Sequence, residues 1–137
     1  DDICNIKNNY GAFDVIVDSF CLQSIVLDDD RSRVFSFVQT HLGRGGHYFV
    51  ISAGYSPRKE YHEDYFRDEQ TAIVYQRAKG DETDLADIIV VKGKSYVPVR
   101  RHHTIESLTG ELRRHGFRIV YSSTNDEWGD LSAVVTI

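Results

Sequence analysis

The sequence has no long hydrophobic run, only two cysteines and less positive than negative charge, and each shortage narrows the possible functions. No run approaches the roughly twenty apolar residues that a membrane-spanning helix needs, and no signal-peptide pattern is visible. The only cysteines, Cys4 and Cys21, are not spaced as CxxC, so we expect free thiols in a reducing cytoplasm. The histidines do not lie at zinc-ligand spacing from them, so we expect no metal site.

Positive charge is scarce. The chain has 16 Lys and Arg against 21 Asp and Glu, which gives a net charge of -5 at pH 7. Such a balance argues against general binding to nucleic acid phosphates. The length of 137 residues, with 41% hydrophobic and 27% charged residues, is typical of one globular domain with one core. We therefore expect residues 1–137 to form a single domain.

What the sequence does contain is a strand–helix–strand pattern near its beginning. The apolar runs Phe13–Val17 and Tyr48–Ala53 are rich in Val, Ile and Phe and do not alternate with polar residues. This pattern predicts strands that are buried on both faces of a parallel sheet. Two parallel strands joined by a helix form a βαβ unit, whose crossover is right-handed by strong default.

The helix between the two strands has clear boundaries. Asp28, Asp29 and Asp30 are expected to supply the cap of the helix and to place negative charge at its positive end. Four apolar residues then share one helix face: Val34, Phe35, Val38 and Leu42. We expect Gly43 to end the helix by adopting a left-handed conformation.

The same stretch carries two short motifs of a known family. One is FDxIxD, at Phe13, Asp14, Ile16 and Asp18, and the other is LxxGG, at Leu42, Gly45 and Gly46. In order and separation they resemble the class I S-adenosylmethionine (SAM) dependent methyltransferases, which carry FDxIxD on their fourth strand and L-K-P-G-G before their fifth. Here Gly43 and Arg44 stand where Lys and Pro are usual.

The resemblance implies an α/β fold: a partial Rossmann-like methyltransferase sheet with strands four to seven, of which the last is antiparallel. A helix from Thr104 to about His115, ended by Gly116, and strands at 118–122 and 131–137 match the end of the family fold, in the order five, seven, six. Between about residues 55 and 103 we expect a small antiparallel β insert, with Pro98 on an edge strand.

The glycine-rich turn that holds SAM in this family is missing, because no GxGxG occurs in the sequence. The first residue is Asp rather than Met, so we expect the sequence to begin inside a longer chain. We expect the full-length chain to be a SAM-dependent methyltransferase, and these residues alone to be inactive and to bind SAM weakly or not at all. Without a neighbouring strand, Phe13–Val17 is an exposed edge that predicts a homo-oligomer.

The resemblance also implies the cofactor-binding residues. It places Asp2 and Ile3 against the adenine ring, although a frayed, solvated terminus is the alternative. Asp18, Ser19 and Phe20 follow the fourth strand, where ligands of open parallel sheets bind. Asp18 acts either on a substrate proton or the SAM ammonium group, or as the cap of a loop.

Residues for the methyl acceptor are expected next to the cofactor. The family's amino methyltransferases for adenine and cytosine carry two prolines after the fourth strand, and their absence here favours a small-molecule acceptor. Cys21 borders that position. The aromatic and charged segment 55–68 is either a lid or a surface excursion, and its candidate contacts are Tyr55, Arg58, Tyr61, His62, Tyr65 and Phe66.

Some questions stay open at this stage. The run from Arg100 to His103 fits an anionic substrate, but a solvated approach to the next helix is the preferred interpretation. No single catalytic residue is readable, because positioning accounts for much of such catalysis. Two other functions remain: a non-catalytic methyltransferase-like interaction module, and a fragment of a nicotinamide-dependent oxidoreductase, which an all-parallel sheet would favour.

Overall fold

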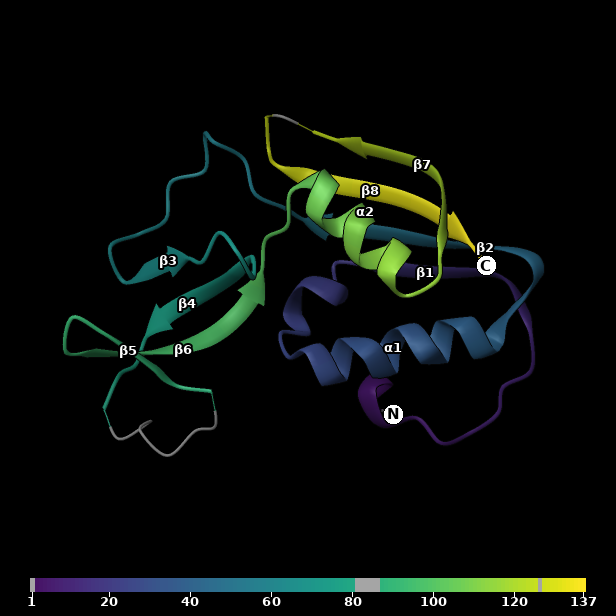
Figure 1. The fold of residues 1–137 in the computed structure, drawn as a ribbon, viewed down its shortest axis with the longest axis horizontal. Coiled ribbons are helices and arrows are strands. Elements are labelled where there is room, and N and C mark those ends of the chain that lie inside the picture. Colours follow the sequence, from purple (N-terminus) through teal and green to yellow (C-terminus); the bar gives the residue numbers. More distant parts are fainter. Residues whose placement is uncertain (1, 81–86, 126) are drawn as a thin grey trace.

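The computed structural model describes residues 2–80, 87–125 and 127–137 and contains two four-stranded sheets (Figure 1). The main sheet has the order β1-β2-β8-β7, with β1 at Phe13–Ser19, β2 at Leu42–Ala53, β8 at Asp130–Thr136 and β7 at Arg118–Thr124. β1 pairs with β2 in parallel, and β8 is antiparallel to both β2 and β7. The predicted parallel pair and reversed last strand are confirmed, and an all-parallel nicotinamide-binding sheet is contradicted.

Helix α1, Asp28–His41, joins β1 to β2, and the three predicted aspartates form its negative first turn. The predicted aspartate cap is wrong, because the N-cap residue is Leu27, which makes no side-chain hydrogen bond there. It passes into β2 without a loop, because Leu42 ends the helix in an extended conformation. The predicted left-handed conformation at Gly43 is wrong, since Gly45 adopts it instead, with φ 78°. Gly46 is needed for close packing: a Cβ there would lie 3.0 Å from the carbonyl oxygen of Asp14.

Helix α2, Ile105–Arg114, confirms the second predicted helix. The Thr104 side chain accepts a hydrogen bond from the backbone N–H of Ser107, and Gly116 follows the helix with φ 82°. Both helices pack against the same face of the main sheet. The resulting core consists of Leu22, Val34, Phe35, Val38, Leu42, Tyr48, Val50, Leu108, Leu112, Phe117, Leu131, Ala133 and Val135.

The opposite face of the main sheet is open, so the prediction that Phe13–Val17 and Tyr48–Ala53 are buried on both faces is wrong. Val15 and Val17 on β1 are 55% and 61% exposed, and Phe49 and Ile51 on β2 are 37% and 36% exposed. Tyr48 and Val50 alternate with these residues and point toward the helices, where they are buried. The sequence pattern is typical of strands that are covered on both faces. In the described part of the chain, helices cover only one face of the main sheet.

The insert forms the second sheet, in the order β3-β4-β6-β5, with all pairs antiparallel. Its strands are β3 at Tyr65–Arg67, β4 at Ile73–Arg77, β5 at Ile89–Val91 and β6 at Lys94–Arg101. Lys92 and Gly93 join β5 to β6 with positive φ at both residues, as a two-residue hairpin turn requires. Part of the polar stretch 80–84, which sequence composition suggests is a turn, lies outside the described residues.

The predicted edge position of Pro98 is wrong, because β6 lies between β4 and β5. The chain accommodates Pro98 in two ways. β5 is short and pairs only with Lys94–Tyr96, and the β4–β6 register shifts where Tyr75 faces Pro98. The missing N–H therefore lies at an irregularity beyond the end of the neighbouring strand.

Two short 3-10 helices complete the fold: η1 at Ile3–Asn5 and η2 at Leu22–Ser24. η1 packs beside α1, and η2 connects β1 to α1. Among the described residues, no helix has both the length and the apolar character to cross a membrane.

Candidate functional site

The carboxyl ends of β1 and β2 face the insert sheet, which lies beyond the end at which β2 leaves the main sheet (Figure 1). The junction is closed by backbone contacts: Gly54 and His103 form an isolated parallel bridge, and the N–H of Tyr55 donates to the His103 carbonyl at 2.7 Å. In open α/β sheets this end is where ligands bind. The junction is therefore the candidate site.

Asp18 has the geometry of a loop cap. Its Oδ1 accepts backbone N–H bonds from Cys21 at 3.0 Å and Leu22 at 3.1 Å, while the Tyr48 hydroxyl lies 3.5 Å from Oδ2. Burial raises the pKa of Asp18, although these hydrogen bonds oppose the shift. Of the two roles open at the sequence level, the contacts support the cap that turns the chain into η2.

Ser19, Phe20 and Cys21 are exposed at the end of β1. Phe20 has φ 60°, which is unusual for a bulky residue, and its N–H donates to the Ile51 carbonyl at 2.7 Å. Strained residues of this kind cluster at ligand sites. Burial raises the pKa of the Cys21 thiol, and the charge of Asp18 adds to the shift, so Cys21 has no activated thiolate.

Asp2 and Ile3 lie in a defined turn. The Asp2 carboxylate accepts hydrogen bonds from the Asn5 amide at 2.6 Å and the Cys4 N–H at 3.0 Å, while Ile3 is half-buried against the core. Burial raises the pKa of Cys4, with smaller contributions from the charges of Asp30, Asp2 and Cys21. Cys4 lines a cavity together with Ser24 and Ile25, so η1 lies beside the segment between η2 and α1.

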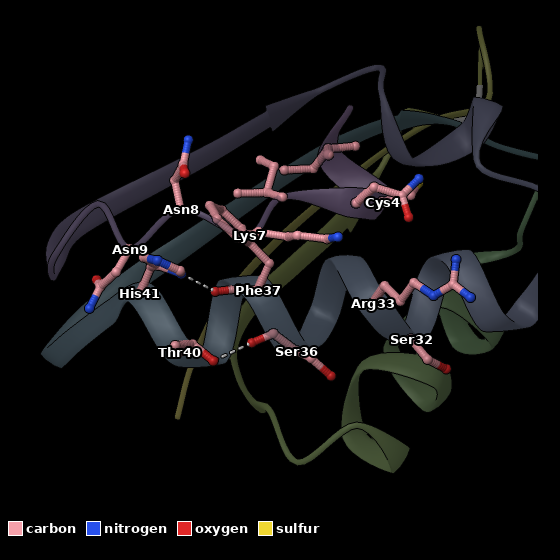
Figure 2. A pocket seen from close by; sticks show the side chains of 13 residues that line it. Cys4, Lys7, Asn8, Asn9, Ser32, Arg33, Ser36, Phe37, Thr40 and His41 are labelled. Carbon is pink, nitrogen blue, oxygen red and sulfur yellow. Dashed lines mark hydrogen bonds between the residues drawn. The ribbon is translucent and has the colours of Figure 1, made fainter. Parts of the chain in front are cut away.

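A groove of about 610 Å³ lies between residues 3–9 and α1 (Figure 2). Ile3 is the only predicted site residue among the described residues that line it. The hydrogen bonds within it are local to the helix, from Thr40 to the Ser36 carbonyl at 2.8 Å and from the His41 ring to the Phe37 carbonyl at 2.9 Å (Figure 2). No convergent set of polar groups distinguishes this groove as a site.

The six predicted acceptor contacts of segment 55–68 do not all gather at the junction. Tyr55 does, half-buried, with the Arg67 guanidinium carbon 4.5 Å from its ring centroid. Tyr65 is part of β3 and pairs with Gln76. Arg58 and His62 are exposed, and the His62 ring lies 3.9 Å from the Asp64 carboxylate.

Sequence analysis named Tyr61 as a candidate contact but assigned the wrong environment to the residues that it meets at the junction. Arg101, His102 and His103 are only 7%, 5% and 6% exposed, so the predicted solvated approach is wrong. The Tyr61 hydroxyl lies 2.7 Å from Nδ1 of His102, and the two rings stack with centroids 5.7 Å apart. Burial raises the pKa of Tyr61 to about 12 and, with nearby cations, lowers that of His102 to about 4, so both groups are neutral at pH 7.

A second buried network joins the two helices to the junction. Arg31 donates from Nε and Nη2 to the two carboxylate oxygens of Glu111, each at 2.6 Å, and from Nη1 to the Leu22 and Ile25 carbonyls. His103 lies 3.4 Å from the same carboxylate, and burial lowers its pKa to about 4. One signal was readable in the sequence: Arg31 precedes Val34, Phe35 and Val38 by three, four and seven residues, on the buried face.

No family model and no curated protein matches the chain. Solved structures do. A SAM-dependent methyltransferase from Clostridium acetobutylicum ATCC 824 is similar over 100% of this chain and 63% of its own, with TM-score 0.64 and 16% identity. The glycopeptide N-methyltransferase MtfA is similar over 100% and 58%, with TM-score 0.63 and 16% identity. The PH0226 protein from Pyrococcus horikoshii OT3 is similar over 99% and 57%, with TM-score 0.65 and 12% identity.

The chain therefore has the class I methyltransferase fold, as the sequence motifs predicted. It spans less than two thirds of the length of these three proteins. At such low identity the likeness shows the fold alone.

Proposed function

We propose that these residues form the acceptor-side part of a SAM-dependent methyltransferase that methylates a small molecule. The observation that carries the proposal is the main sheet, in which a parallel β1–β2 pair is followed by a reversed β8 placed between β2 and β7. Its similarity to solved methyltransferases over almost the whole chain supports the same function.

The residues at the end of β1 fit the cofactor. Ser19 and Phe20 are exposed there. We propose that Asp2 and Ile3 contact the adenine ring. Once bound, SAM would supply a methyl group on a positively charged sulfur. The protein's own contribution is to bind and orient the acceptor, to exclude water and to receive the proton that the acceptor loses.

Binding of SAM tests this proposal directly. We expect weak binding, because the 137 residues contain no glycine-rich turn to hold the ribose and methionine parts. Amide NMR signals of Ser19, Phe20 and Cys21 should shift when SAM is added at millimolar concentration and should not shift with NAD. Unchanged signals at these three residues would contradict the proposal, and tight one-to-one binding by calorimetry would contradict the predicted need for the glycine-rich turn.

The second candidate is a non-catalytic interaction module, and one observation favours it. The open face of the main sheet exposes apolar side chains next to the unpaired edge of β1. We propose that a second copy of the chain covers this face, since unpaired strand edges template pairing with another chain. Methyl transfer from labelled SAM by a longer chain that includes the glycine-rich turn distinguishes the two candidates, because only the enzyme produces a methylated acceptor.

A further inference from the structure

We propose that Tyr61 and His102 form the proton-accepting pair of the site, and that the acceptor is an anionic small molecule with a hydroxyl group. The inference rests on the proposed methyl transfer and names its acceptor class. Four observations at the junction support it. They are the contact between Tyr61 and His102, the buried His102 Nε2 without a partner, three cations that form no ion pair with a described carboxylate, and the location of these groups at the ligand-binding end of the main sheet.

The Tyr61–His102 contact has the geometry of a proton relay. The 2.7 Å separation between the Tyr61 hydroxyl and Nδ1 is short, and the stacked rings hold the two groups in register. Tyr61 is half-buried while His102 is 5% exposed, so Tyr61 is the member that a ligand can reach. His102 acts through Tyr61 as a positioning residue.

The second ring nitrogen of His102, Nε2, is buried and has no hydrogen-bond partner in the described part of the chain, and the same is true of Nε2 of His41. His102 differs from His41 because its other ring nitrogen contacts the Tyr61 hydroxyl. In either tautomer of the neutral ring, one nitrogen faces Tyr61 and the other is unsatisfied. A buried polar atom without a partner costs free energy, and such exceptions often mark a site with a role in catalysis.

Three cations surround the pair. Lys59, Arg100 and Arg67 each lower the pKa of His102 through their charge, and His103 also contributes. None of the three forms an ion pair with a described carboxylate. Two are held by backbone groups instead: Lys59 donates to the Gly54 carbonyl at 3.2 Å and Arg67 to the His102 carbonyl at 2.7 Å.

The charge of the Asp130 carboxylate acts on Lys59, but the charges that shift the pKa of His102 are all positive, in a chain of net charge -5. A carboxylate or phosphate on the acceptor would supply the missing counter-charge. It would also raise the pKa of His102, because it would oppose the cations that lower it. Binding of the correct acceptor would thereby make His102 a better base.

The group lies where the acceptor is expected. His103 directly follows His102 and forms a β-bridge with Gly54 at the end of β2. The Arg67 guanidinium lies over the ring of Tyr55. Segment 55–64 and the end of β6 therefore converge at the ligand-binding end of the main sheet.

The proton step balances as follows. The acceptor hydroxyl gives its proton to the Tyr61 oxygen while Tyr61 gives its own proton to Nδ1 of His102. The acceptor oxygen keeps the electron pair of its O–H bond and uses it for the new bond to the methyl carbon. The electron pair of the broken carbon–sulfur bond stays on the sulfur of the cofactor.

The first test needs no cofactor. The probe is 4-hydroxybenzoate, an anion with a phenolic hydroxyl, and the matched neutral compound is 4-hydroxybenzyl alcohol. In protein labelled with nitrogen-15 in its histidines, 4-hydroxybenzoate should raise the pH midpoint of the His102 ring signals by about one unit. The neutral alcohol should leave the midpoint in place. No shift with 4-hydroxybenzoate, or an equal shift with both compounds, would overturn the inference.

Variants locate the anion site. R100Q should weaken 4-hydroxybenzoate binding roughly tenfold and leave the weaker binding of the alcohol unchanged. R33Q is the matched control, because Arg33 is an exposed arginine on α1 and should not affect either compound. Equal effects of R100Q and R33Q would contradict the assignment.

Methyl transfer then separates this inference from the proposed function. In a longer chain that supplies the glycine-rich turn, and with SAM present, Y61F and H102Q should lower kcat with KM nearly unchanged. Both should remove the rise of kcat between about pH 4 and pH 6 that titration of His102 produces. If 4-hydroxybenzoate binds and shifts His102 but the longer chain methylates no acceptor, the proposed function is wrong and the anion site stands. If methylation proceeds and neither variant changes the pH profile, the inference is wrong and the proposed function stands.

Discussion

Arg31 is fully buried, at 1% exposure, and its guanidinium forms an ion pair with Glu111. Burial by itself would raise the pKa of Glu111, but the hydrogen bonds and charge of Arg31 outweigh it and lower the pKa. Replacing Arg31 by Met leaves the carboxylate buried and unpaired. We expect R31M to lower the free energy of unfolding by about 3–5 kcal/mol, measured by urea denaturation.

Two further variants make this prediction specific. R33M removes an exposed arginine from the same helix and should change stability by less than about 0.5 kcal/mol. R31M/E111L replaces the whole pair by apolar side chains and should recover much of the loss. If R31M and R33M were equally stable, the pair would not be the buried contact described.

Gly54 is the residue on which the junction closes most tightly. A Cβ there would lie 2.5 Å from Cγ of Leu131 and 2.6 Å from the Gly129 carbonyl oxygen. G54A should therefore destabilise the fold by about 3 kcal/mol. G110A is the control: its Cβ would meet only Arg114, at 3.6 Å, so the helix should gain about 0.5–1 kcal/mol. Thermal unfolding of both variants checks the opposite signs.

At this scale the sequence predicts residues whose role depends on local spacing. The buried face of α1 and the cap at Thr104 follow from periodicity and capping rules, and both are confirmed. Burial of Arg101 to His103 could not be predicted, because it depends on contacts far along the chain. The Arg101 guanidinium bonds the Val26 carbonyl and Asp28, and the His103 carbonyl bonds Tyr55.

Among the elements, β1 combines an unpaired edge with two exposed valines. If a second copy of the chain covers this surface, a charge on it should prevent association. We expect V17E to be monomeric by light scattering at concentrations where the unmodified chain forms dimers or larger species. V90E carries the same change on β5, where Val90 is 68% exposed, and should associate normally. A monomeric unmodified chain at high concentration would contradict the proposal.

The element scale also shows what a strand pattern can and cannot reveal. Unbroken Val, Ile and Phe runs correctly predict that β1 and β2 are parallel. They do not predict which face of each strand the helices cover. Val15 and Tyr48 have equally apolar neighbours in sequence, but Val15 is exposed and Tyr48 is buried. Proline is excluded from a central strand only where the neighbouring strand would accept a hydrogen bond from its backbone N–H. β5 is too short to reach Pro98, so the missing N–H of Pro98 leaves no β5 acceptor unpaired.

At the scale of the whole molecule, the residues between β6 and α2 connect the insert to the main sheet. His102 and His103 are buried there, and burial lowers the pKa of each to about 4. The candidate site therefore shares its residues with the contact that holds the two sheets together. The family motifs located the end of β1 in the sequence, but the site needs Tyr61 and His102, which come together only through the insert.

The same two histidines make the stability of the whole molecule depend on pH. Their ordinary pKa is near 6.5 and their folded pKa is about 4, so the unfolded chain binds more protons between these values. Stability is therefore greatest above pH 6.5 and falls as the pH drops toward 4. From pH 7 to pH 5 we expect a loss of about 2 kcal/mol per histidine, measured by urea denaturation.

Variants assign that loss to its source. H103Q should unfold more easily at pH 7 but lose roughly half of the pH dependence, because one of the two titrating rings is gone. H62Q removes an exposed histidine, whose side chain is 69% accessible, and should keep the full dependence. Stability that is constant from pH 7 to pH 5 would show that His102 and His103 are solvated, and the buried junction on which the proton relay depends would not exist.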